Sequence, residues 1–101
     1  MKTIARENLD FENYTIKAEQ TEDLTIIFKV FDKNNVLLFS THREVGDCMD
    51  DYSDDNVDHI LNEFKNNNIL LSEDEEEWFY SMMHEHIYFM SKDALAPLNA
   101  I

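Results

Sequence analysis

The sequence predicts an α+β domain in the order α-β-β-β-α-α, a three-stranded antiparallel meander with helices packed on one face. Two observations carry this prediction. Residues 13–42 contain alternating and β-branched apolar runs, which are typical of strands. Residues 53–91 contain apolar residues at helical spacing, which is typical of amphipathic helices. The chain has 101 residues, 44% of them hydrophobic, so residues 1–101 are expected to form one domain around one core.

The first half of the chain supplies the predicted sheet. Residues 2–10 are expected to form one short helix. Three strands follow over residues 13–19, 24–31 and 36–42, where apolar side chains alternate with polar ones or cluster as β-branched and aromatic residues. The last two strands are joined by Asp32-Lys33-Asn34-Asn35. This segment suits a hairpin, because asparagine tolerates the positive φ of such turns.

The second half supplies two longer helices. Residues 53–65 carry apolar side chains at i, i+3, i+4 and i+7, with Ser53 as a candidate N-cap. The last helix is expected from Glu73 to about Ser91, and residues 92–101 form a loosely held tail. The apolar face of the first of these helices consists of Val57, Ile60, Leu61 and Phe64. The face expected for the last consists of Trp78, Met82, Met83, Ile87 and Met90.

An acidic segment opens the last helix. Five consecutive carboxylates, Glu73 to Glu77, follow Ser72 and precede three aromatic residues that end in Tyr80. Ser72 and Glu75 fit a capping box, and acids suit the first turn of a helix. Five acids exceed what a helix start requires, since each added carboxylate repels the others. The five residues Glu73, Asp74, Glu75, Glu76 and Glu77, called the acid run below, therefore indicate a basic partner.

Charge is unevenly distributed along the chain. The net charge of −14 divides into −1 for residues 1–43, with seven acids and six bases, and −13 for residues 44–91, with fourteen acids and one base. Such an anionic half repels nucleic acid and anionic membranes and attracts basic clefts. Clefts that hold phosphate backbones are the most basic of these, so we expect a protein partner and no direct DNA binding.

Enzymatic and metal-binding functions have little support in the sequence. His84 and His86 point about 200° apart on a helix and do not share an ion, while His42 and His59 stand alone. No phosphate-binding glycine loop or nucleophile arrangement is present. We therefore expect no enzyme, cofactor or metal. The single cysteine allows no internal disulfide, and neither a signal peptide nor a membrane span is recognisable, which predicts a cytoplasmic protein.

The chain resembles the small type II-A anti-CRISPR proteins of phages and prophages in three segments. Asn13-Tyr14-Thr15-Ile16-Lys17 is similar to the family's first strand. Ile27-Phe28-Lys29-Val30 with Asp32-Lys33-Asn34-Asn35 is similar to its second strand and hairpin. Phe64-Lys65-Asn66, followed by the acid run and an aromatic residue, is similar to the junction of its last two helices. The segments cover about half of the chain.

The resemblance implies a DNA mimic that binds the guide-loaded type II CRISPR nuclease inside a bacterial host cell. Asp74, Glu75 and Glu77 would face the arginines that read the protospacer-adjacent motif (PAM), and Asp32, Asn34 and Asn35 would form a hairpin that reaches toward a nuclease centre. Asn13 stands where the family has an acid, Lys33 and Val36 replace acidic hairpin residues, and Asn34 replaces a glycine. The loop at residues 44–54 is about nine residues longer, and its added acids would form a second mimic surface: Asp47, Asp50, Asp51, Asp54 and Asp55.

The sequence therefore predicts a phage-encoded inhibitor, most simply a monomer, that blocks PAM and target-DNA binding by acidic mimicry. The predicted partner-binding residues are Asn13, Asp32, Asn34, Asn35, Asp50, Asp51, Glu73, Asp74, Glu75, Glu76, Glu77 and Tyr80. Two alternatives stay open. One is a mimic directed at another DNA-binding protein, such as a restriction enzyme or a repressor. The other is an acidic structural or adaptor protein that uses its methionine and aromatic helix face as an oligomer interface.

Overall fold

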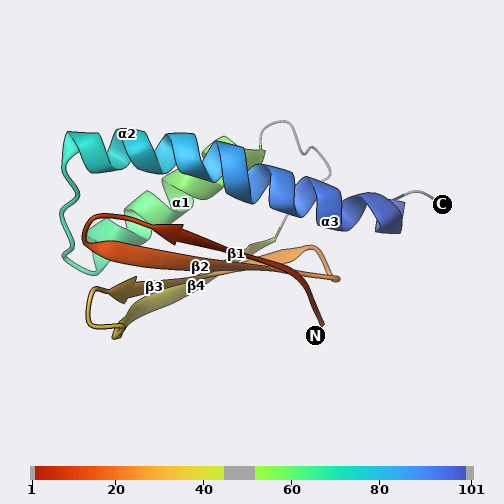
Figure 1. Ribbon diagram of the computed structural model, residues 1–101, viewed down its shortest axis with the longest axis horizontal. Helices are drawn as coiled ribbons and strands as arrows, with labels where there is room; N and C mark the ends of the chain where they lie inside the picture. The colour runs from red at the N-terminus through yellow and green to blue at the C-terminus, as the bar shows by residue number, and fades with distance from the viewer. Residues whose placement is uncertain (1, 45–51, 100–101) are drawn as a thin grey trace.

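The fold is a four-stranded antiparallel sheet with all of its helices on one face, as the computed structural model shows for residues 2–44 and 52–99 (Figure 1). The strands lie in the order β1-β2-β3-β4. They are β1 (Thr3–Asp10), β2 (Tyr14–Thr21), β3 (Thr25–Asp32) and β4 (Leu37–Glu44). The helical layer consists of α1 (Tyr52–Asn66), α2 (Glu73–Met82), a π-helical turn (Met83–Tyr88) and α3 (Phe89–Asn99). The predicted α+β class and the meander β2-β3-β4 are confirmed.

The predicted helix at residues 2–10 is wrong, because this segment is the edge strand β1. Its register with β2 runs from Thr3 opposite Thr21 to Asp10 opposite Thr15. Ala5, Arg6 and Glu7 are good helix formers, but strand pairing satisfies the backbone groups along β2 that would otherwise lack partners.

One fully buried side chain fixes the face of β1. Leu9 is 1% exposed and lies opposite Ile16, whose side chain is completely buried. The turn that joins the two strands is closed by the Phe11 amide, which donates to the Tyr14 carbonyl over 2.6 Å. The sheet therefore has four strands where the sequence predicted three.

The hairpin between β3 and β4 has the predicted turn chemistry. One Asp32 carboxylate oxygen, Oδ1, accepts from the backbone amides of Asn34 (2.9 Å) and Val36 (3.0 Å). Asn35 has a φ of 64°, in the left-handed region that asparagine tolerates. The predicted loop from residue 44 is corrected at its start, since Glu44 is the last residue of β4.

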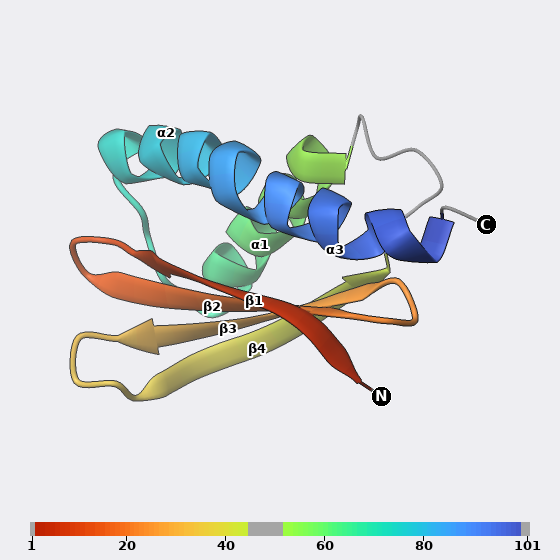
Figure 2. The ribbon, with the colours of Figure 1, turned by 45° about the vertical axis from the view of Figure 1, so that its right-hand side comes forward.

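The core lies between the sheet and the helices (Figure 2). α1 buries the face that the sequence predicts, and it begins at Tyr52, one residue before the candidate N-cap Ser53. On the last helix the prediction is partly wrong. Phe79, Met83 and Ile87 are buried, while Trp78 remains 36% exposed. The largest fully buried side chains include Ile16, Ile26, Phe28 and Val30 from the sheet, and Ile60, Phe64 and Phe79 from the helices.

The helix does not end near Ser91 as predicted, because α3 continues to Asn99. α3 contacts β1 and β2. The predicted fold assigned β1 to a helix, and so offered no sheet edge on which a longer helix could pack. None of the helices that the structure describes combines the length and the apolar character needed to cross a membrane.

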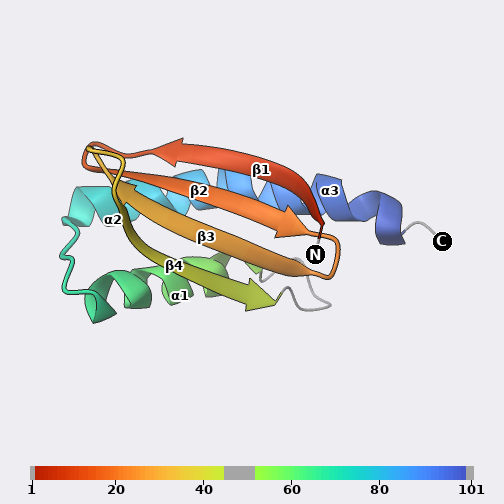
Figure 3. The same cartoon turned by 90° about the horizontal axis from the view of Figure 1, so that it is seen from below.

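The opposite face of the sheet carries no helix from residues 2–44 or 52–99 (Figure 3). This face, called the outer face below, is formed by the strand residues that alternate with the buried ones. The molecule thus has two unlike sides, an acidic helical layer and an open sheet.

Candidate functional site: an acidic end

Three connections lie at the same end of the molecule: the β1–β2 turn, the β3–β4 hairpin and the start of α2 (Figures 1 and 3). For the two turns this arrangement follows from the topology, because the first and third turns of an antiparallel meander lie at the same end of its strands. The acidic end is defined here as Asp10, Glu12, Asn13, Asp32, Asn34 and Asn35 together with the acid run. The acidic end includes all predicted binding residues that the structure describes except Tyr80.

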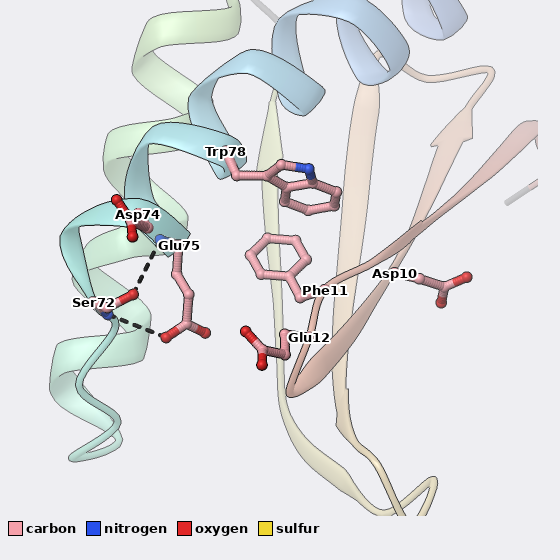
Figure 4. A pocket seen from close by; sticks show the side chains of 7 residues that line it. All are labelled: Asp10, Phe11, Glu12, Ser72, Asp74, Glu75 and Trp78. Carbon is pink, nitrogen blue, oxygen red and sulfur yellow. Dashed lines mark hydrogen bonds between the residues drawn. The ribbon is translucent and has the colours of Figure 1, made fainter.

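The capping box predicted at the start of α2 is confirmed. The Glu75 amide donates to the Ser72 hydroxyl over 3.1 Å, and the Ser72 amide donates to Glu75 Oε1 over 3.2 Å (Figure 4). Glu75 therefore has a structural role that its neighbours lack. Glu73, Asp74 and Glu77 are exposed and Glu76 is half-buried, so three carboxylates of the acid run are fully available to a partner.

A hollow of about 370 Å³ lies between α2 and the β1–β2 turn (Figure 4). The Phe11 and Trp78 rings meet in it edge to face, with centroids 4.4 Å apart. The carboxyl groups of Glu12 and Glu75 face each other across it (Figure 4). Glu75 Oε2 has almost no accessible surface and no hydrogen-bond partner. The lining residues are Asp10, Phe11, Glu12, Ser72, Asp74, Glu75 and Trp78.

Carboxylates beside aromatic rings favour a cationic group, since each carboxylate accepts charge-assisted hydrogen bonds and each ring face attracts positive charge. Sequence reasoning missed Asp10, Phe11 and Glu12 as site residues. Their acid-aromatic-acid pattern is visible in the sequence. The predicted helix over residues 2–10 ended at Asp10, and this prediction gave no reason to place Asp10, Phe11 and Glu12 beside α2.

Several predicted site residues have structural contacts of their own. Asp32 accepts hydrogen bonds that close the hairpin, and Asn35 supplies its positive φ. The side chain of Asn34, between them, is exposed. The Tyr80 hydroxyl donates to Asp58 Oδ1 over 2.7 Å and joins α2 to α1. Asn13 is exposed in the β1–β2 turn. Of the remaining predicted residues, Asp50 and Asp51 lie outside the described residues, as does Asp47.

The acid run has no ion-pair partner within the described part of the chain. There, the one ion pair joins Arg6 to Glu19 on the sheet, with Nε and Oε1 3.5 Å apart. In the same residues, no cluster of histidine, cysteine and carboxylate side chains could hold a metal ion. The electrostatic character of the acidic end is therefore set by carboxylates that face solvent.

The chain matches no protein-family model, and comparisons with curated proteins and with solved structures give no significant match. The resemblance to anti-CRISPR proteins thus stays a prediction.

Proposed function

We propose that the protein inhibits a DNA-binding protein by presenting its acidic end in place of a DNA phosphate backbone. The observation that supports this most directly is that the acid run packs beside the β1–β2 turn, at the end of the molecule that also carries the β3–β4 hairpin. Carboxylates on three separate elements form a rigid anionic surface, and a rigid ligand avoids part of the ordering cost of binding. Charge-assisted bonds to arginine and lysine would supply specificity.

Exposed apolar side chains at the same end support a protein as the partner. Leu70, in the connection between α1 and α2, is 88% exposed. Val36 and Leu37, at the β3–β4 hairpin, are 55% and 50% exposed. Apolar side chains beside charged ones are a usual composition of protein interfaces.

The target that we propose is the guide-loaded type II CRISPR nuclease. The PAM-reading arginines of such nucleases donate two parallel hydrogen bonds to a guanine. A carboxylate accepts the same pair of bonds, so Asp74 and Glu77 would compete with the PAM for these arginines. Another DNA-binding protein of similar charge is the second candidate, and capture of a different nuclease or repressor from host lysate would favour it.

The adaptor alternative keeps only part of the face on which it depends. Met83 and Ile87 are buried in the protein's own core, and Met82 and Met90 are partly buried against it. Trp78 is 36% exposed, so a smaller oligomer interface on this helix stays open as an alternative.

The experiment is an electrophoretic competition. Guide-loaded nuclease is mixed with increasing amounts of the protein, and labelled target DNA is added afterwards. We expect loss of the DNA-bound band near stoichiometric inhibitor, because both ligands need the same arginines. Undiminished DNA binding at a large excess of inhibitor would rule out PAM competition.

A further inference from the structure

The outer face of the sheet contains the one cationic row in the described part of this acidic chain. Register places Asn8 opposite Lys17, Lys17 opposite Lys29, and Lys29 opposite Ser40. These four residues are called the lysine row. All four carry hydrogen-bond donors, and the register places them side by side across the sheet. Figure 3 shows the four strands from the side of this open face.

The lysine row is unfavourable in the isolated protein. Like charges directly opposite each other on neighbouring strands destabilise a sheet. Glu19, two residues from Lys17 on this face, is paired with Arg6. The Lys17 ammonium group lies over the Phe31 ring, 4.8 Å from its centroid, which holds it in place without neutralising it. An anionic ligand between Lys17 and Lys29 would remove the repulsion.

A hollow adjoins the lysine row on the same face. Its volume is about 440 Å³, within the range of small-molecule sites. Ser40 belongs to both the row and the hollow, and Ile27 provides an apolar patch between hydroxyl and imidazole groups. Two carboxylates, of Asp23 and Glu44, lie at the end away from the lysines. The lining residues are Asp23, Thr25, Ile27, Ser40, Thr41, His42 and Glu44.

We propose that the outer face binds single-stranded RNA, with phosphates on Lys17 and Lys29 and a nucleoside in the hollow. The ammonium groups attract phosphate oxygens. The carboxylate of Glu44 would accept hydrogen bonds from ribose hydroxyls, including the 2′-hydroxyl that distinguishes RNA from DNA. Asp23 would offer its second oxygen, since its Oδ1 is already hydrogen-bonded to the Thr21 hydroxyl. An open four-stranded sheet is also a surface on which proteins bind single-stranded RNA.

The high negative charge of the helical layer does not prevent this contact. Packed layers lie about 10 Å apart, and charges are screened over about 8 Å at physiological salt. On the outer face, the bases Arg6, Lys17 and Lys29 balance the acids Asp10, Glu19 and Glu44. A ligand on the lysine row would therefore lie closest to the two ammonium groups of Lys17 and Lys29. This contact is independent of the proposed inhibition, because it uses the opposite side of the molecule and needs no nuclease.

The test is fluorescence anisotropy of the full chain with a labelled single-stranded RNA of about 10 nucleotides, in the range of typical site sizes. Two phosphate contacts predict a slope of log affinity against log salt of about −1.4, or about a sevenfold loss between ~50 and ~200 mM salt. The variant Lys17→Gln/Lys29→Gln is expected to bind at least about tenfold more weakly. The control variant Lys65→Gln removes one positive charge from the last turn of α1, on the helical layer. It should bind RNA like the wild type.

Circular dichroism of the double variant separates lost binding from lost folding, and Lys29→Gln alone provides a milder change with an intermediate loss. A DNA strand of the same sequence should bind more weakly than the RNA. Absence of saturable RNA binding at ~50 mM salt, equal binding by the folded double variant, or equal affinity for DNA and RNA would each overturn the proposal.

Discussion

Glu75 has two roles, because it caps the start of α2 and is also one of the five carboxylates of the acid run. One carboxylate oxygen, Oε1, accepts from the Ser72 amide, while the other is buried without a hydrogen-bond partner. The residue as a whole lines the hollow beside Phe11 and Trp78. A charge reversal at this position would remove a helix cap together with a candidate contact. Exchanges that separate the two roles are therefore more informative.

Ser72→Ala is expected to lower the free energy of unfolding by about 1 kcal/mol, since it removes the acceptor for the Glu75 amide. Glu75→Gln keeps a capping box, because glutamine accepts the same hydrogen bond, and should change stability by less than about 0.5 kcal/mol. Urea denaturation of both variants measures these values. Equal losses would mean that the charge of Glu75, and not its hydrogen bond, stabilises the start of α2.

At the same scale, turn chemistry was predictable where the residues favour the turn. Asp32 and Asn35 form the hairpin that their side chains indicate. Leu24 was not predictable, because leucine rarely has a positive φ and yet adopts 67° before β3. Nearby, the Thr21 hydroxyl donates to the Thr25 carbonyl and accepts from the Thr25 amide. These local hydrogen bonds between a side chain and the backbone close the turn around Leu24.

At the scale of elements, strong periodicity was a reliable guide and local propensity was not. α1, β2 and β3 were predicted because their patterns match the faces that they bury. β1 was mistaken for a helix because only Leu9 among its residues is fully buried, so its apolar pattern is weak. Its strand conformation is set by β2, a partner that the local sequence of β1 does not reveal.

The cross-strand pair of Lys17 and Lys29 gives a prediction for the sheet. Lys29→Glu places a carboxylate opposite Lys17 and should raise the free energy of unfolding by up to about 1 kcal/mol. Lys33→Glu, in the hairpin, makes the same change in net charge without a charged residue directly opposite, and should change stability by less than about 0.5 kcal/mol. Chemical denaturation at low salt compares them. A destabilised Lys29→Glu protein would show that the two lysines do not repel each other.

At the scale of the whole molecule, the fold converts a charge division along the chain into a division between layers. The near-neutral residues of the first half form the sheet, and the acidic second half forms the helices above it. The sequence predicted the acids and, through the resemblance, many of the site residues. It did not predict that the β1–β2 turn meets α2, since that contact depends on the fourth strand.

The most direct measurement of the central proposal compares two charge-reversed proteins for binding to the guide-loaded nuclease by calorimetry. Asp74→Lys/Glu77→Lys changes exposed residues of the acidic end. Glu85→Lys/Asp93→Lys makes the same charge change at exposed positions further along the helical layer. If the acidic end is the contact, the first protein should bind at least about a hundredfold more weakly, or about 1.4 kcal/mol per reversed carboxylate. The second should keep affinity within about twofold. Equal losses in both proteins, or full affinity of the first, would contradict an acidic end that acts as a shaped substitute for DNA.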